Sequence, residues 1–265
     1  MTESTSSSDL VLLTRPETGV AHLVLNRPAA MNALDLATAR AFRKACEQLA
    51  GDREVRAVVL RGKGRGFGAG GDLASMREKP EVSVPELIGE MNVALGLLAH
   101  LDAPVIASLH GVVAGGSLSL SLACDLAIAA EGTRFTLAYA NVGASPDVSG
   151  TWSLPRLVGL RKALELALLC EPFDAAEALR LGLVNRVVPA GALEEETAKL
   201  ARRLADGPTV AFGQTRRLMR AAFETTLTAQ LEGERQGFAA CTRSEDFRAA
   251  VAAFLEKRKP VFQGR

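Results

Sequence analysis

Two glycine-rich segments, each placed after an apolar run, are the first candidates for chemistry in this chain. Residues 62–71 contain six glycines, and residues 111–119 contain Gly115-Gly116 before a run of serine and leucine. Glycine permits sharp turns and lets a ligand approach backbone N–H groups. A helix that begins near Gly116 directs its unpaired N–H groups back at the turn. Two such turns can each offer one N–H to a single oxygen, which is an oxyanion hole that stabilises an enolate.

Other uses of these glycines fit the sequence less well. Gly66, Gly68 and Gly71 form a G-x-G-x-x-G pattern, but a dinucleotide fold continues into a long helix, and Pro80 follows too soon for one. No Gly-Lys pair precedes Ser or Thr, which argues against a P-loop. A serine hydrolase of the nucleophile-elbow type would need a histidine after Ser117, and every histidine precedes it. A flexible surface loop and a tight turn without a ligand remain the alternatives.

One acidic residue, Asp147, stands in the uncharged stretch 137–154, in which Tyr139 is the other ionisable side chain. An isolated carboxylate can act as a general base and then as a general acid. It can equally be a turn residue or the N-cap of the helix that follows. The residues alone leave both interpretations open.

A metal or disulfide framework is not predicted. The four cysteines lie far apart with no C-x-x-C pair, and the three histidines show no ligand spacing. A magnesium ion held by carboxylates would leave no such trace. Widely spaced thiols are typical of a reducing compartment, so we expect a cytoplasmic protein. The cysteines are Cys46, Cys124, Cys170 and Cys241.

The elements that position these residues alternate between strand and helix in the first half of the chain and are mostly helical afterwards. Period-2 and apolar runs predict strands at Leu10–Arg15, Val20–Leu25, Val55–Leu60, Val105–Leu109, Leu126–Ala130 and Leu183–Val188. Helical spacing predicts helices at Leu34–Leu49, Val84–Leu101, from about Gly116, Arg161–Leu169, Asp174–Leu181, Leu193–Leu204, Thr209–Phe223, Thr226–Cys241 and Ser244–Lys257. The alternation predicts an α/β fold.

Composition agrees with a soluble globular protein rather than a nucleic-acid or membrane protein. The chain has 265 residues, 48% of them hydrophobic, and 31 basic residues nearly balance 30 acidic ones. A dedicated nucleic-acid binder would be basic. The uncharged stretch 103–124 includes a proline, a histidine and three glycines, so it is no membrane helix. Residues 1–9 are polar and lack a targeting pattern, and we expect a disordered tail there.

Five motifs in order resemble the crotonase family of enoyl-CoA hydratases and isomerases, and the resemblance covers about residues 11–262. They are Leu25-Asn26-Arg27-Pro28 with Asn32-Ala33-Leu34, Phe67-Gly68-Ala69-Gly70-Gly71-Asp72-Leu73, His110-Gly111-Val112-Val113-Ala114-Gly115-Gly116, residues 146–156 (PDVSGTWSLPR) and residues 254–262 (FLEKRKPVF).

The resemblance implies a spiral of ββα repeats over residues 10–205 and a helical trimerisation region over residues 206–265. It implies homotrimers, or hexamers built as pairs of trimers. The substrate would be an acyl-CoA, with no cofactor, since coenzyme A is part of the substrate. The thioester oxygen would lie between the N–H groups of Gly71 and Gly116. The residues assigned to CoA binding by the resemblance are Arg27, Ala69, Phe254 and Lys257.

The departures from the family pattern carry the most information. Hydratases of the family hold and activate water with two glutamates, and the matching positions here are Ser119 and Tyr139. Hydration is therefore expected to be poor or absent. Family members without those glutamates place a catalytic aspartate at the position of Asp147. They include isomerases of phenylacetate breakdown that act on 2-(1,2-epoxy-1,2-dihydrophenyl)acetyl-CoA, and a 4-chlorobenzoyl-CoA dehalogenase in which the aspartate attacks carbon. The dehalogenase has a histidine where this chain has Asn92, which favours the isomerases.

We therefore expect an enoyl-CoA isomerase in which Asp147 moves the proton, with Tyr139, Asn92 and Ser119 lining the acyl pocket. One rival is a hydratase that uses Glu86 and Glu90, which share a helix face. Another is a CoA-binding protein without activity. The sequence leaves open the acyl group and pathway, the choice between trimer and hexamer, and whether Asp147 shuttles a proton or acts as a nucleophile.

Overall fold

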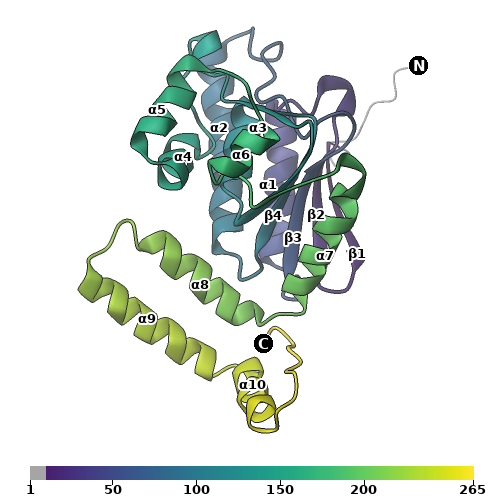
Figure 1. Ribbon diagram of the computed structural model, residues 1–265. Helices are drawn as coiled ribbons and strands as arrows, with labels where there is room; N and C mark the ends of the chain where they lie inside the picture. Colours follow the sequence, from purple (N-terminus) through teal and green to yellow (C-terminus); the bar gives the residue numbers. More distant parts are fainter. Residues whose placement is uncertain (1–9) are drawn as a thin grey trace.

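The computed structural model describes residues 10–265, so the tail expected at residues 1–9 lies outside the described residues. A six-stranded sheet forms its centre, in the order β1-β2-β3-β4-β6-β9 (Figure 1). The first two strands form an antiparallel hairpin, and the others add in parallel. The strands are β1 (Val11–Glu17), β2 (Val20–Leu25), β3 (Ala57–Gly62), β4 (Val105–Leu109), β6 (Leu126–Ala130) and β9 (Arg186–Val188). The α/β class is confirmed.

A second sheet of three very short strands was not predicted. It pairs β5 (Val112–Ala114) in parallel with β7 (Arg134–Thr136), and β7 antiparallel with β8 (Phe173–Asp174). Strands of two or three residues are too short to show a period-2 pattern, which explains the omission. The small sheet matters because β5 leads directly into the second glycine turn.

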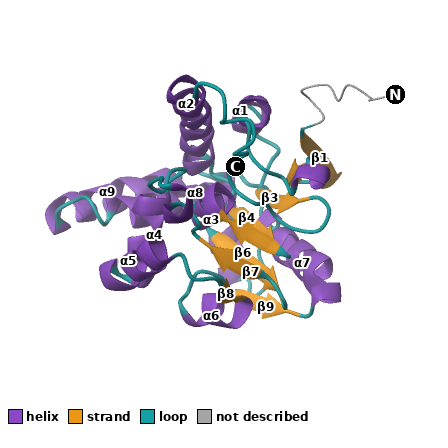
Figure 2. Cartoon of the chain, turned by 90° about the horizontal axis from the view of Figure 1, so that it is seen from above, coloured by secondary structure: helices purple, strands orange, loops and turns teal. Residues whose placement is uncertain are grey.

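Helices cover both faces of the main sheet. Figure 2 shows α7 (Leu193–Ala205) on one face and α1 (Leu36–Ala50) and α2 (Pro80–His100) on the other. Alternate strand residues divide between two apolar layers: Val59 packs with the α7 side, and Val58 packs with α1, α2 and α3 (Gly115–Leu122). The remaining helices of this part of the chain are α4 (Gly150–Val158), α5 (Leu160–Leu169) and α6 (Ala175–Arg180).

Most predicted element boundaries hold, with a few corrections. Asp174 and Ser244, at the predicted starts of their helices, are the N-caps, and each accepts a backbone N–H three residues on. Helix α2 begins at Pro80 rather than Val84, because proline fits the first turn of a helix. The strand predicted at Leu183–Val188 shortens to the three residues of β9. In residues 10–265, α2 alone has the length and apolarity of a membrane span. Its buried residues are Leu87, Met91, Ala94 and Leu98, which pack in the core.

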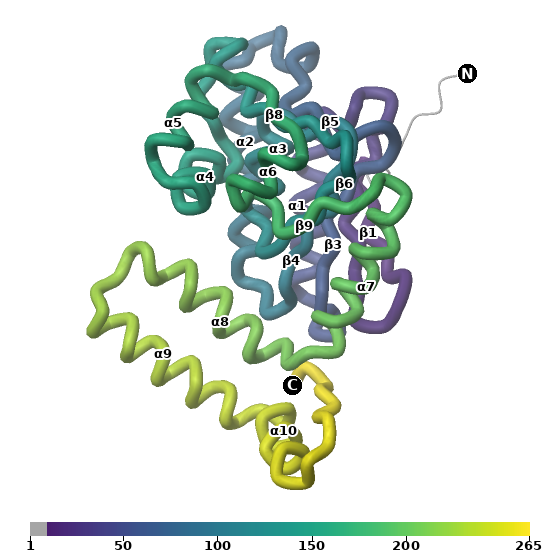
Figure 3. Tube along the Cα trace, in the orientation of Figure 1, coloured from purple at the N-terminus to yellow at the C-terminus, as the bar shows by residue number. Residues whose placement is uncertain are grey.

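The C-terminal helices form an arm that extends from the core. Helices α8 (Thr209–Ala221), α9 (Leu227–Thr242) and α10 (Glu245–Leu255) follow the end of α7 at Ala205, the boundary predicted for the core (Figures 1 and 3). Their trimerisation role stays a prediction.

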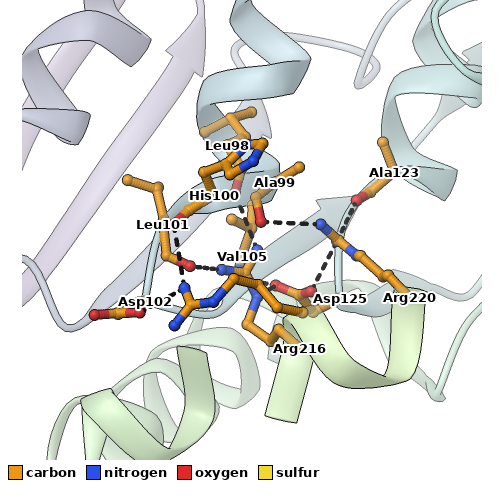
Figure 4. Close-up of polar contacts among 11 residues, drawn as sticks. Leu98, Ala99, His100, Leu101, Asp102, Val105, Ala123, Asp125, Arg216 and Arg220 are labelled. Atoms are coloured by element: carbon orange, nitrogen blue, oxygen red, sulfur yellow. Dashed lines mark hydrogen bonds and ion pairs between the residues drawn. The ribbon is translucent and has the colours of Figure 1, made fainter. Parts of the chain in front are cut away.

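Arginines of α8 anchor this arm to the core (Figure 4). The buried Arg216 pairs with Asp125 Oδ2 at 2.7 Å and donates to the Leu98 carbonyl at 3.0 Å. Arg220 pairs with the other oxygen of Asp125 at 2.9 Å and donates to the Ala123 carbonyl. The last carbonyls of a helix lack intrahelical partners, so guanidinium groups satisfy them here while Asp125 balances the charge.

A buried asparagine ties the first glycine segment to the rest of the fold. Asn32, 1% exposed and in the left-handed region at φ 54°, accepts the N–H of Arg27 through its side-chain oxygen. Its side-chain nitrogen donates to the carbonyls of Lys63, Gly66 and Phe67. One side chain therefore satisfies four backbone groups and sets the path of the loop.

We predict that Asn32→Ala lowers the free energy of unfolding by about 2–4 kcal/mol, because it leaves buried backbone groups unpaired. Urea denaturation of both proteins measures the change. Asn141→Ala, at an exposed position of the same residue type, is the control and should change stability by less than about 0.5 kcal/mol. Equal stability of the two variants would show that water replaces the bonds of Asn32.

Candidate active site

The two glycine segments lie side by side and are joined by hydrogen bonds. Gly68 donates its N–H to the Val112 carbonyl at 3.0 Å and accepts from the Ala114 N–H at 2.9 Å. Gly70 donates to the hydroxyl of the fully buried Ser117 at 3.2 Å. The first segment is therefore no flexible surface loop at this point, and the alternative interpretation is wrong. The sequence does not predict this role of Ser117, which was considered above as a nucleophile.

Glycine is required in both segments because the two backbones touch. A Cβ atom on Gly68 would lie 2.2 Å from the Ser117 hydroxyl. A Cβ on Gly111, where φ is +60°, would lie 2.0 Å from the Arg65 carbonyl oxygen. No side chain fits either gap. The glycines thus fix the spacing between the turns.

We expect the N–H groups of Gly71 and Gly116 to hold an oxyanion. Both point away from the hydrogen bonds that shape their turns. The bridge between Leu34 and Gly71 uses the Gly70 carbonyl (2.7 Å) and the Asp72 N–H (2.9 Å). In a parallel bridge the residue between those two groups turns its own N–H to the opposite side. Gly116 is the second residue of α3, and first-turn N–H groups have no acceptor within the helix.

Asp147 lies beside Gly116. A Cβ atom built on Gly116 would be 3.6 Å from Asp147 Oδ1 and 3.7 Å from the Tyr139 hydroxyl. Tyr139 donates to Asp147 Oδ1 at 2.6 Å, and its oxygen lies 2.9 Å from Ser119 Oγ. Because the tyrosine proton goes to the carboxylate, Ser119 donates to the tyrosine. The structure thus brings together four residues predicted for the site: Gly116, Ser119, Tyr139 and Asp147.

Burial dominates the electrostatics of this pair. Desolvation raises the pKa of Asp147, and the hydrogen bond from Tyr139 opposes the rise. Desolvation and the neighbouring carboxylate raise the pKa of Tyr139, which keeps its hydroxyl a donor. A carboxylate with a raised pKa next to helix N–H groups is suited to accept and return a proton.

The backbone after Asp147 is held in an uncommon conformation. Val148 and Ser149 both lie in the left-handed region, at φ 49° and 69°, which is rare for a β-branched residue and costs on the order of 1–3 kcal/mol. Ser149 is the N-cap of α4, with no side-chain cap bond. The interpretation of Asp147 as an N-cap is therefore wrong. Buried Val148 and the helix that follows hold the carboxylate at Gly116.

The glutamates of the rival hydratase are engaged elsewhere. Glu86 pairs with Arg40, and Glu90 lies 3.1 Å from Arg43, both arginines being on α1. Both carboxylates therefore take part in ion pairs between α1 and α2. Asn92, predicted for the acyl pocket, is exposed on α2, and its role stays a prediction.

The residues expected to bind CoA are in two different places. Arg27 pairs with Asp72 at 3.0 Å and Asp35 at 3.2 Å, so it joins the elements around the first turn. The exposed Ala69 lies in the turn, and its N–H donates to the Met31 carbonyl.

Phe254 and Lys257 belong to the C-terminal arm, at and just after the end of α10. Phe254 is exposed near the end of α10, and Lys257 is exposed just after it, at φ 56°. Figures 1 and 3 place α10 at the tip of the arm, away from α3 and α4. Their assignment to CoA binding stays a prediction.

Residues 10–265 contain no group of three His, Cys, Asp or Glu side chains placed to hold a metal ion.

Comparison with known proteins identifies the family. The model of the enoyl-CoA hydratase/isomerase family matches residues 15–265. The chain belongs to this family. A 1,2-epoxyphenylacetyl-CoA isomerase of Escherichia coli is 36% identical over 96% of this chain and 98% of its own length. A short-chain-enoyl-CoA hydratase of Clostridium acetobutylicum is 33% identical over 91% of this chain and 92% of its own.

Solved structures confirm the crotonase-type fold. An enoyl-CoA hydratase of Bacillus anthracis superposes with a TM-score of 0.91 at 30% identity, over 97% of this chain and all of that one. The predicted ββα spiral class is therefore confirmed. Relatives include both isomerases and hydratases, so membership in the crotonase family gives acyl-CoA chemistry without choosing between the two reactions.

We predict that Asp147→Asn stabilises the folded protein at neutral pH. Because the pKa of Asp147 is raised by folding, the folded protein keeps a proton that the unfolded chain has released. Stability therefore falls as the pH rises from the pKa of the unfolded chain to that of the folded protein. The variant removes this penalty, and its advantage should vanish below about pH 4, the pKa of an exposed aspartate. Urea unfolding across pH measures the difference. Asp174→Asn, at the exposed cap of α6, is the control, since asparagine caps equally well. Destabilisation of Asp147→Asn at pH 7 would contradict the assignment.

Proposed function

We propose that this protein is an enoyl-CoA isomerase that uses Asp147 as its single acid and base. The Asp147 carboxylate removes a proton from the α-carbon of a 3-enoyl-CoA, and the electrons move into the thioester to form a dienolate. The protonated Asp147 then returns the proton to the γ-carbon, which leaves the conjugated 2-enoyl-CoA. Atoms and charge balance without a cofactor, because coenzyme A is part of the substrate.

The observation that carries the proposal is the place of Asp147, 3.6 Å from the Cβ position of Gly116 and hydrogen-bonded to Tyr139. The N–H groups of Gly71 and Gly116 would hold the thioester oxygen on which the negative charge develops. Each such donor contributes on the order of 10²–10³ in rate. The carboxylate then lies beside the substrate carbon next to the thioester.

Hydration would require a second acid–base group. The positions of the two hydratase glutamates hold Ser119 and Tyr139, and their hydroxyls are 2.9 Å apart. The Tyr139 hydroxyl keeps its proton at neutral pH, since its pKa is raised, so it is not a base that could activate water. One carboxylate is sufficient for a proton shift and insufficient for the addition of water. The E. coli isomerase at 36% identity supports the same choice and extends the proposal to acyl groups derived from phenylacetate, and therefore to phenylacetate catabolism, beside fatty acid metabolism.

We also propose a cytoplasmic homotrimer or a hexamer. All four cysteines are free in the structure, as expected in a reducing compartment. The arm exposes large apolar side chains that a monomer would leave in water: Met219, Phe223, Leu227, Leu231, Phe238, Phe254 and Leu255. In such an assembly Phe254 and Lys257 would reach the CoA bound to a neighbouring subunit.

The isomerase proposal predicts that the wild type converts 3-hexenoyl-CoA to the conjugated thioester and that Asp147→Asn loses at least ~2 orders of magnitude in rate. Ultraviolet absorbance of the conjugated product measures both. Hydration of crotonyl-CoA is assayed in parallel. Wild-type hydration without isomerisation would reveal a hydratase, and binding without either reaction would reveal a CoA-binding protein. A fully active Asp147→Asn would overturn the mechanism.

The assembly proposal predicts a mass of three or six chains in analytical ultracentrifugation. Replacing the exposed Phe238 and Leu231 of α9 by Glu should shift the protein toward monomers, because charges would enter an apolar interface. Replacing the exposed Arg203 of α7 by Glu is the control and should leave the mass unchanged. A monomeric wild type would contradict the proposal.

A further inference from the structure

A chain of hydrogen bonds connects α3 to Asp147. Ser119 is fully buried on α3, with its Oγ 2.9 Å from the Tyr139 hydroxyl, and Tyr139 donates to Asp147 Oδ1 at 2.6 Å. A hydroxyl has one proton, and a carboxylate has none to give. The donors therefore run in one direction, from Ser119 to Tyr139 to Asp147, and these three residues form a relay.

We propose that Ser119 is a positioning residue that acts on Asp147 through Tyr139. It holds the Tyr139 hydroxyl in the orientation that donates to Oδ1, and this leaves Oδ2 as the oxygen that exchanges the proton with the substrate. Ser119 then has a role different from the acyl-pocket lining expected from the sequence. The inference rests on the proposed function, because it concerns the base of that reaction.

The packing around Ser119 leaves its hydroxyl little freedom. Gly150, the first residue of α4, lies directly against it: a Cβ atom built on Gly150 would be 2.5 Å from Ser119 Oγ. The Gly150 N–H donates to the Asp147 carbonyl at 2.8 Å, so the residue that confines Ser119 also fixes the backbone of the base. Glycine is required at this position, because any side chain would displace the hydroxyl.

A second serine of α3 shows by contrast what Ser119 does. Serine in a helix commonly bonds to a carbonyl of the preceding turn. Ser121, also buried, does so, and donates to the Leu118 carbonyl at 2.7 Å. Ser119 instead bonds to a side chain from outside the helix. Helix α3 thus carries one serine that bonds within the helix and one that belongs to the relay.

The Ser119 bond strengthens the bond that Tyr139 makes. A hydroxyl that accepts a hydrogen bond becomes a better donor, because successive bonds polarise one another. The Ser119 bond acts to lower the pKa of Tyr139 against the larger effect of burial. The Tyr139 bond in turn acts to lower the pKa of Asp147 against burial. A carboxylate oxygen that accepts a strong bond is the less basic of the two, so proton transfer falls to Oδ2.

No charged side chain offers a second route in the part of the chain that the structure describes. The influences on the pKa of Asp147 are burial, the Tyr139 bond and a backbone hydrogen bond. Those on the pKa of Tyr139 are burial, Asp147 and Ser119. Helix α3 has no ionisable residue, and the charged residue of α4, Arg156, pairs with Glu224. A substitution at Ser119 therefore reaches the carboxylate through Tyr139.

The single tyrosine of the chain makes the relay directly observable. Tyr139 is the one tyrosine of the sequence, so protein labelled with carbon-13 at the ring carbon that bears the hydroxyl gives one NMR signal. That signal responds to the hydrogen bonds of the hydroxyl, and a pH titration therefore shows the midpoint at which Asp147 takes up a proton. Asp147→Asn should abolish this titration step, which assigns it without any need for turnover.

Ser119→Ala is the variant that tests the relay. It removes the donor to Tyr139, weakens the Tyr139 bond to the carboxylate and should raise the titration midpoint by at least ~0.3 pH unit. Ser121→Ala is the matched control: it makes the same substitution at a buried serine of α3 that bonds within the helix, and it should leave the midpoint unchanged. Ser119→Cys has a similar size and a weaker donor, so it should give an intermediate midpoint and replaces the alanine variant if that one does not fold.

Kinetics distinguish positioning from contact with the acyl group. With 3-hexenoyl-CoA, Ser119→Ala should lower kcat about fivefold or more and leave KM unchanged within about twofold, because the hydroxyl orients the base and does not touch the substrate. The pH at which kcat falls on the acid side should rise together with the NMR midpoint. A raised KM with an unchanged midpoint would show instead that Ser119 lines the acyl pocket.

The outcomes separate this inference from the proposed function. A midpoint in Ser119→Ala equal to that of the wild type would overturn the relay, even if the protein isomerises 3-hexenoyl-CoA. A raised midpoint that Ser121→Ala does not reproduce would support the relay even if no isomerisation is found, because the titration needs no substrate.

Discussion

The contact between two backbone turns, with no room for a side chain between them, is the constraint on which the site depends. Gly68 bonds to both Val112 and Ala114, and a Cβ at residue 68 would collide with the Ser117 hydroxyl. The two turns follow different strands, so the contacts between the turns set the separation of the amides of Gly71 and Gly116. Asn32 holds the other side of the first turn through three carbonyls. Positioning of this kind is what electrostatic stabilisation of an enolate requires, because the donors do not move during the reaction.

The carboxylate at this site reflects a balance between two opposed effects. Burial raises the pKa of Asp147 and the Tyr139 hydrogen bond lowers it, and burial is the larger effect. A carboxylate with its ordinary pKa would be a weak base toward a carbon acid, and one protonated at neutral pH would not be a base at all. The Tyr139 bond therefore opposes the rise in pKa that burial causes. The strained turn at Val148 fits the same account, since strain at a functional position is offset by the surrounding packing.

Much of this could be predicted from the sequence, for physical reasons that differ from residue to residue. Buried strands such as β4 and amphipathic helices such as α1 follow from periodicity, and the caps at Asp174 and Ser244 follow from local hydrogen bonding. The strands of the small sheet could not be predicted, because tertiary pairing rather than local pattern creates them. The meeting of Asp147, Tyr139 and Gly116 came only from the family resemblance. The structural roles of Asn32 and Ser117 left no sequence signal beyond their place in a motif.

The arm has a polar side toward the core and an apolar side toward solvent. Toward its own core, α8 presents Arg216 and Arg220. Both donate to carbonyls at the ends of α2 and α3, and both pair with Asp125. Away from the core, it and α9 expose Met219, Leu231 and Phe238. A segment that is charged toward its own core and apolar toward solvent is the reverse of an ordinary surface helix. Specific polar anchoring fixes the angle of the arm, which non-directional apolar contacts could not do, and leaves the apolar face for another surface. The same anchored helix leads directly to Glu224, which accepts the indole N–H of Trp152 from α4 at 3.0 Å, so the start of α4 is also tied to the arm.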